Sequence, residues 1–183
     1  MKTYQKILFP IVVAAQLFVL VFMIAKQELL LANGAKVLLK CEPIDPRSLF
    51  SGDYVDLNYE ISSIGENIIS KSKINDIYAL EGKKIYVALK KKPNDMHHNI
   101  AAISDNLEEL KLIYSTIIRG RVEYAGSTQI RVKYGVETYF VPQREGKKIE
   151  DNIGNTSVEV SIADNGDSAI SKLFVDGQEV KFY

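Results

Sequence analysis

The sequence contains little of the material from which metal, redox and catalytic sites are commonly built. It has one cysteine, Cys41, and two histidines. A single thiol cannot form a disulfide within the chain and cannot supply a CxxC motif, so the fold must be held by its core. We find no HExxH, no glycine-rich phosphate loop and no Ser-His-Asp pattern. We therefore predict no cofactor and no enzyme.

The chain also has no net charge, because 23 basic residues balance 23 acidic ones. Nucleic-acid binding needs a clustered basic surface that neutralises phosphates, so this balance argues against a nucleic-acid partner. The charges are unevenly distributed along the chain, since residues 1–25 carry Lys2 and Lys6 but no acidic residue.

The longest apolar run in the sequence extends from Ile7 to Ala25 and carries no charge. As a helix, its nineteen residues would span about 28 Å, which is close to the hydrocarbon thickness of a bilayer. A cleaved signal peptide is the alternative. Such a peptide has a shorter apolar region and ends in small residues, whereas this run passes directly into Lys26. We predict an uncleaved, single-pass transmembrane helix over about residues 7–25.

The charges beside this helix predict its direction. Lys2 and Lys6 precede it, so the positive-inside rule places the N-terminus in the cytoplasm and residues 26–183 outside the cell membrane. We expect residues 28–32 to continue the helix and Asn33-Gly34 to end it, with Gly34 as a left-handed cap. The predicted organisation is an anchor over residues 1–33 and an extracytoplasmic domain over residues 34–183.

The outer domain is predicted to be mainly β. In residues 53–61, hydrophobic side chains alternate with polar ones, so that Val55, Leu57, Tyr59 and Ile61 share one face of a strand. Residues 62–82 have no clear pattern, and residues 106–114 and 146–153 resemble short helical turns. Other strands are expected at residues 36–42, 84–90, 99–103, 117–124, 128–134, 136–141, 158–162, 169–175 and 179–182. Short strands separated by turn signals predict an antiparallel sandwich or a small barrel-like domain.

Gly52-Asp53-Tyr54-Val55-Asp56-Leu57-Asn58-Tyr59 fits the motif of the GDYXXLXY-domain family at all five fixed positions. The sequence is similar to this family on both sides of the motif. The matching positions are Gly52, Asp53, Tyr54, Leu57 and Tyr59 in the motif, Pro46 and Arg47 upstream, and Tyr134, Gly135 and Glu137 downstream. The resemblance implies a membrane-anchored bacterial protein of undetermined biochemistry, whose relatives are encoded beside, or fused to, polytopic membrane proteins.

Two interpretations of the motif are open. In the structural one, Gly52 permits a tight entry, Leu57 and Tyr59 point inward, and Asp53 accepts hydrogen bonds from a turn. In the binding one, Arg47, Asp53 and Tyr54 contact a partner. From the resemblance and the anchor together, we expect a non-catalytic accessory module that binds a polytopic membrane protein; a small-molecule ligand is left open.

Two other classes of function were weighed. A signal-peptidase-like enzyme would need a nucleophile at Ile44 or Pro43, which cannot attack a carbonyl, and no spacing selects Ser48 or Ser51 instead. A ligand- or metal-sensing domain could use His97 and His98 with Asp95. However, adjacent side chains on an extended segment point apart, which disfavours a shared metal ion.

Overall fold

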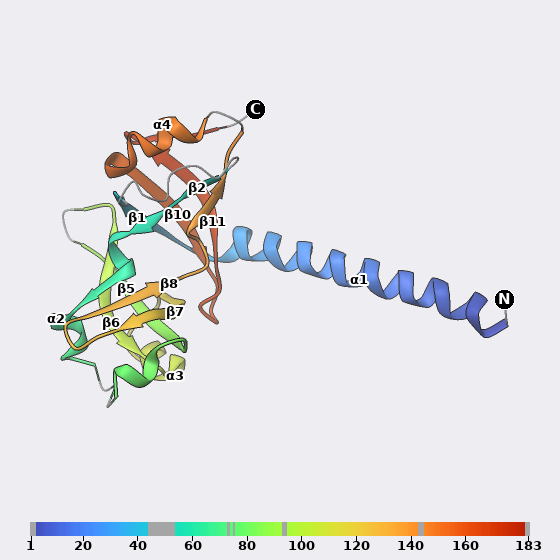
Figure 1. Cartoon of the computed structure of the whole chain (residues 1–183), viewed down its shortest axis with the longest axis horizontal. Coiled ribbons are helices and arrows are strands. Elements are labelled where there is room, and N and C mark those ends of the chain that lie inside the picture. Colours follow the sequence, from blue (N-terminus) through green and yellow to red (C-terminus); the bar gives the residue numbers. More distant parts are fainter. Residues whose placement is uncertain are drawn as a thin grey trace.

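A long N-terminal helix followed by a β domain makes up the computed structural model (Figure 1), which describes residues 3–43, 54–72, 74, 76–92, 95–142 and 145–181. The helix, α1, extends over Thr3–Asn33. Its segment Leu8–Asn33 is long and apolar enough to cross a membrane, and its most apolar window is not buried against the domain. A helix that is apolar on all sides needs an apolar environment. This segment could therefore serve as a membrane span or a signal anchor.

The end of α1 lies where the sequence predicts it, but the reason for Gly34 differs. We expected a left-handed cap, and Gly34 is not among the glycines with positive φ. Instead, a Cβ atom at Gly34 would lie 2.6 Å from the carbonyl oxygen of Leu30 and 2.7 Å from Oγ of Ser161. The expectation of a left-handed cap is wrong. Glycine is required because the helix end and a strand of the domain approach closely at this point.

In the part of the chain that the structure describes, the β domain contains two five-stranded antiparallel sheets and a two-stranded ribbon. The first sheet has the order β12-β11-β10-β1-β3 and consists of β1 (Ala35–Glu42), β3 (Asn58–Tyr59), β10 (Thr156–Ile162), β11 (Ser168–Val175) and β12 (Gln178–Glu179). The second has the order β4-β8-β7-β5-β6 and consists of β4 (Ser63–Gly65), β5 (Lys84–Lys91), β6 (His98–Ser104), β7 (Ile117–Ala125) and β8 (Gln129–Lys133). The ribbon pairs β2 (Tyr54–Asp56) with β9 (Thr138–Phe140).

Short helices connect the strands. Those among the described residues are the 3₁₀ helix η2 (Glu60–Ser62), α2 (Glu66–Ile69), the 3₁₀ helix η3 (Tyr78–Leu80), α3 (Leu107–Lys111), α4 (Gly146–Glu150) and the 3₁₀ helix η4 (Ile153–Asn155). The helical turns expected at residues 106–114 and 146–153 correspond to α3 and α4. The segment 62–82, which had no clear sequence pattern, contains β4, α2 and η3.

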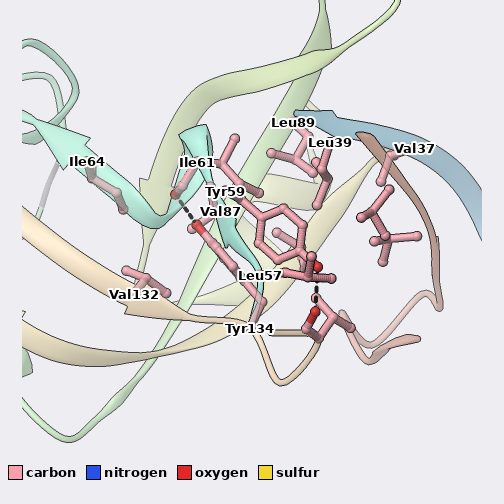
Figure 2. Close-up of a cluster of buried hydrophobic side chains, with 14 of the residues drawn as sticks. Val37, Leu39, Leu57, Tyr59, Ile61, Ile64, Val87, Leu89, Val132 and Tyr134 are labelled. Carbon is pink, nitrogen blue, oxygen red and sulfur yellow. Dashed lines mark hydrogen bonds between the residues drawn. The ribbon is translucent and has the colours of Figure 1, made fainter. Parts of the chain in front are cut away.

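The two large sheets are joined into a nearly closed, barrel-like arrangement. The chain leaves the first sheet through β3, turns in η2 and enters the second sheet in β4. On another side, β1 and β6 approach each other, and the backbone N–H of Leu38 donates to Nδ1 of His98 at 3.3 Å. Inward side chains of both sheets, including Val37, Leu39, Val87 and Val132, form one core (Figure 2). The prediction of a mainly β, antiparallel domain is confirmed.

The predicted strand over residues 53–61 requires a correction. The inward face is as expected, because Val55, Leu57, Tyr59 and Ile61 are all buried. The described part, however, is not one strand but β2, β3 and η2. β2 pairs with β9, whereas β3 pairs with β1. Between them, the N–H of Leu57 donates to the carbonyl oxygen of Glu137 at 2.6 Å. The alternation of buried and more exposed side chains continues across this break, because both strands and the 3₁₀ turn pack against the same core.

Candidate functional site

Two buried tyrosines connect the motif with the downstream signature (Figure 2). Tyr59 donates its hydroxyl to the carbonyl oxygen of Val136, and Tyr134 donates its hydroxyl to the carbonyl oxygen of Ile61 at 2.6 Å. Each tyrosine hydroxyl therefore donates to a backbone carbonyl that lies two residues from the other tyrosine. Burial raises the pKa of both phenols, so both remain neutral donors near neutral pH. This interlock joins two segments that are far apart in the chain.

Glu137 holds the turn on which this interlock depends. One carboxylate oxygen accepts the backbone N–H of Tyr134, and the other accepts the N–H of Gly135 at 2.8 Å. Gly135 has φ of +80°, a conformation that glycine adopts without a steric penalty. Leu57, Tyr59, Tyr134, Gly135 and Glu137 thus have structural roles that explain their presence in the two signatures.

Tyr54 lies on the outer side of the motif, in contact with a second aromatic ring. It is opposite Phe140 in the β2–β9 ribbon, and the two rings meet edge to face with centroids 6.4 Å apart. The Phe140 side chain is 76% exposed, and Tyr54 is half-buried. Exposed aromatic side chains of this kind supply much of the binding energy at protein interfaces. Phe140 was not among the predicted binding residues, because only the strand pairing brings it to Tyr54.

Several predicted site residues lie outside the described part of the chain. They are Pro46, Arg47, Ser48, Ser51, Gly52 and Asp53. The binding roles proposed for Arg47 and Asp53 therefore stay predictions. Of the three residues expected to contact a partner, Tyr54 is the one whose surroundings are described.

The C-terminal end of α1 is fastened to the first sheet. The buried hydroxyl of Ser161 donates to the carbonyl oxygen of Leu30 at 2.8 Å, and Nζ of Lys36 donates to that of Leu31 at 2.6 Å. The Leu30 carbonyl oxygen also accepts the backbone N–H of Gly34 at 2.9 Å, so Ser161 adds a second bond there, whereas Lys36 supplies a side-chain donor to the Leu31 carbonyl at the helix end, where partners within the helix are lacking. Leu30 itself is buried. The helix and the domain therefore meet in a specific contact rather than through a free linker.

Asp167 extends this contact by one further turn of the helix, to Lys26. It forms an ion pair with Lys26 at 3.1 Å and a second one with Arg119. Burial alone would raise the pKa of Asp167, but hydrogen bonds from Lys26 and Asn165 and the charge of Arg119 lower it below its usual value. The carboxylate therefore stays ionised and holds the β10–β11 turn beside Lys26.

The candidate metal ligands separate in the structure. Asp95 and His97 meet, with Oδ1 and Nδ1 2.6 Å apart. His98 points elsewhere and accepts the N–H of Leu38. Within the described residues, no group of three or more His, Cys, Asp or Glu side chains could hold a metal ion.

One cluster of functional groups was missed by sequence reasoning. Nε2 of His97 lies 2.8 Å from Oγ of Ser157, a residue 60 positions away in the chain. No motif links the two, because Ser157 is placed by the pairing of β10 with β1 and β11. Asp95, His97 and Ser157 therefore form one hydrogen-bonded cluster.

Comparison with protein-family models matches residues 16–173 to the model described as "GDYXXLXY protein". This range contains both signatures and the second half of the apolar helix. No curated protein and no solved structure matches the chain.

Proposed function

The chain belongs to the GDYXXLXY protein family, and we propose that it is an accessory module of a polytopic membrane protein, held at the outer face of a bacterial cell membrane by α1. The observation that carries the proposal is the fastening of α1 to the β domain through Leu30, Ser161 and Lys36. A flexible tether would only keep a domain near the bilayer. A fastened helix also limits how the domain can turn relative to a partner in the same membrane, which lowers the entropy cost of binding.

The proposed orientation follows from the charges at the two ends of the apolar segment. Lys2 and Lys6 precede it without any acidic residue, so we place the N-terminus in the cytoplasm and the β domain outside. On the other side of the segment, Lys26 is followed closely by Glu28, so this flank carries less net positive charge than the N-terminal one.

The aromatic pair of Tyr54 and Phe140 is the proposed contact surface for the partner. The pairing of β2 with β9 orders the backbone that carries both rings, so this segment does not have to be ordered on binding. Arg47 and Asp53 are close to Tyr54 in sequence and complete the proposed set. Aromatic and arginine side chains are the ones that most often carry binding energy at interfaces.

The test is recovery of the partner from native membranes in mild detergent, with identification by mass spectrometry. We expect the wild-type chain to recover a polytopic membrane protein. Phe140→Ala and Tyr54→Ala should each reduce recovery by roughly tenfold or more, the effect of losing an interface anchor. Arg47→Ala and Asp53→Asn should act in the same direction.

Tyr78→Ala is the matched control, since Tyr78 is also an exposed aromatic residue, 65% exposed, but lies in η3 away from the motif. It should leave recovery unchanged. Recovery of the same membrane protein by all variants would remove the aromatic pair from the interface. Recovery of no membrane protein by the wild-type chain, even after cross-linking, would contradict the accessory role itself.

A further inference from the structure

Three polar side chains form a continuous hydrogen-bonded chain on the outer face of the first sheet. Oδ1 of Asp95 lies 2.6 Å from Nδ1 of His97, and Nε2 of His97 lies 2.8 Å from Oγ of Ser157. The same Asp95 oxygen also accepts the backbone N–H of His97 at 3.0 Å. Asp95 is therefore held by two bonds from one residue, and the imidazole ring is held between the carboxylate and the serine.

The direction of each hydrogen bond follows from the carboxylate. An ionised carboxylate can only accept, so Nδ1 of His97 must carry the proton that lies between them. Hydrogen bonds from the backbone and ring N–H groups of His97 lower the pKa of Asp95, which keeps it ionised. In the tautomer that carries its proton on Nδ1, Nε2 is an acceptor, and the Ser157 hydroxyl donates to it. This is the proton arrangement by which a histidine activates a serine nucleophile.

The strand that carries Ser157, β10, is paired with a neighbouring strand on each side. β10 is an interior strand, and Ser157 pairs with Lys40 of β1 on one side and with Phe174 of β11 on the other. Buried side chains on β10 alternate with Ser157 and Glu159, so the serine projects from the outer face of the sheet. A nucleophile placed on a paired strand has little freedom to move away from its base.

The cluster opens into a pocket of about 650 Å³, which is large enough for a small organic substrate. Leu38, Met96 and Phe174 supply apolar walls. The charged side chains in the lining are Lys40, Lys91, Glu159 and Asp176, of which Lys40 is paired with Glu60 at 2.9 Å. His97 and Ser157 line the same pocket, so the proposed nucleophile and base both face the space that a substrate would occupy.

We propose that Ser157, His97 and Asp95 form a serine-nucleophile site that hydrolyses carboxylic esters with an apolar acyl group. Ser157 is the nucleophile, His97 is the general base, and Asp95 is a positioning residue that fixes the tautomer of the ring. The Lys91 ammonium, in the same pocket, is the group assigned to stabilise the developing oxyanion. The sequence alone predicted no enzyme because the members of this site are not adjacent in the chain.

Water is the only reactant that the reaction needs besides the ester. Oγ of Ser157 attacks the ester carbonyl carbon while its proton passes to Nε2 of His97. Collapse of the tetrahedral intermediate breaks the bond to the alcohol oxygen, which leaves with that proton. A water molecule then gives a proton to His97 and attacks the acyl-serine, and the acid departs as the proton returns to Oγ.

The test uses an alkyl fluorophosphonate, which forms a bond to an activated serine oxygen and releases fluoride. The full-length chain in detergent micelles is treated with the probe and examined by intact mass and peptide mapping. We expect one adduct, on Ser157. Ser157→Ala should abolish it, and His97→Gln should slow it by roughly a hundredfold or more, the contribution of a general base.

The His97→Gln variant separates catalysis from structure, because the glutamine amide can still bond to Ser157 but cannot take its proton. His98→Asn is the matched control. His98 uses Nδ1 to accept the N–H of Leu38, and the asparagine oxygen can replace that acceptor, so labelling should be unchanged. Circular dichroism of each variant checks its folding.

The proposal is overturned if Ser157 in the wild-type chain takes up no probe under conditions that fully label a known serine hydrolase. Equal labelling rates in the wild type and in folded His97→Gln would also overturn it, since the serine would then not depend on a base. The proposed esterase activity is independent of the proposed partner binding. Because labelling of Ser157 and recovery of a membrane partner are measured in separate experiments, failure of one does not decide the other.

Discussion

Tyr54 and Leu57 are three positions apart in the motif, but their side chains have different surroundings. Leu57 is 2% exposed and packs in the core that both sheets share. Tyr54 is half-buried and meets the exposed ring of Phe140. The motif thus combines a residue needed for folding with one that is available to a partner. Tyr59 belongs with Leu57, because its hydroxyl and its ring are both buried.

At this scale we predict that Leu57→Ala and Tyr54→Ala will differ in their effect on stability. Leu57→Ala should lower the free energy of unfolding by about 2–5 kcal/mol, because it leaves a cavity in the core. Tyr54→Ala should cost less, because the half-buried ring leaves no core cavity; its edge-to-face contact with Phe140 contributes about 0.5–1.5 kcal/mol of that cost. Denaturant titration of both variants measures the difference. Equal losses would mean that Tyr54 is a core residue and would weaken the binding interpretation of the motif.

Among the secondary-structure elements, the contact between α1 and β10 has the clearest functional meaning. Gly34 allows the helix end to reach Ser161, and a Cβ atom there would lie within 3 Å of both the Leu30 carbonyl and the Ser161 hydroxyl. Contacts this short are not seen for real Cβ atoms, so a side chain at residue 34 must displace the helix or the strand. Gly34 and Ser161 are therefore central to the geometry of α1 relative to the domain.

We predict that Gly34→Ala will loosen this contact and that Ser161→Ala will do so to a lesser extent. Spin labels at residues 28 and 172, both exposed, should give a narrow distance distribution in the parent chain and a broader one in the variants. Gly65→Ala is the control, because a Cβ atom there meets nothing within 4 Å. An unchanged distribution in Gly34→Ala would contradict the specific contact on which the proposed function depends.

The whole molecule consists of a β domain from which a long apolar helix projects (Figure 1). The large side chains along the helix, including Phe9, Phe18 and Phe22, are exposed rather than packed against the domain. In water, so much exposed apolar surface would be strongly unfavourable. The bilayer is the environment that would remove this cost.

For the molecule as a whole, we predict an uncleaved anchor with the C-terminus outside the cytoplasm. A reporter that is active only outside the cytoplasm, fused after Tyr183, should be active, and the full-length chain should stay in membranes through alkaline washing. Activity of a matched cytoplasmic reporter at the same position would reverse the orientation. A soluble chain that begins near Gly34 would show that the apolar segment is a cleaved signal.

The sequence by itself determined the features that depend on neighbouring residues. The uncharged run from Ile7 to Ala25 predicts the apolar helix, because length and hydrophobicity are local properties. Alternation predicts most strands and the inward face of residues 55–61, because successive side chains of a strand point to opposite sides. The family was identified from fixed positions within short segments, and the match over residues 16–173 confirms it.

Only the tertiary structure decided which distant segments meet. Four features depend on segments that are far apart in the chain. They are the change of pairing partner at Leu57, the reciprocal hydrogen bonds of Tyr59 and Tyr134, the role of Gly34 and the approach of His97 to Ser157. No local sequence pattern predicts these pairings. Alternation of side chains along a strand determines which face of the sheet a residue occupies, but it does not determine which residue lies beside it on the next strand. Closure of the two sheets around one core brought these residues together.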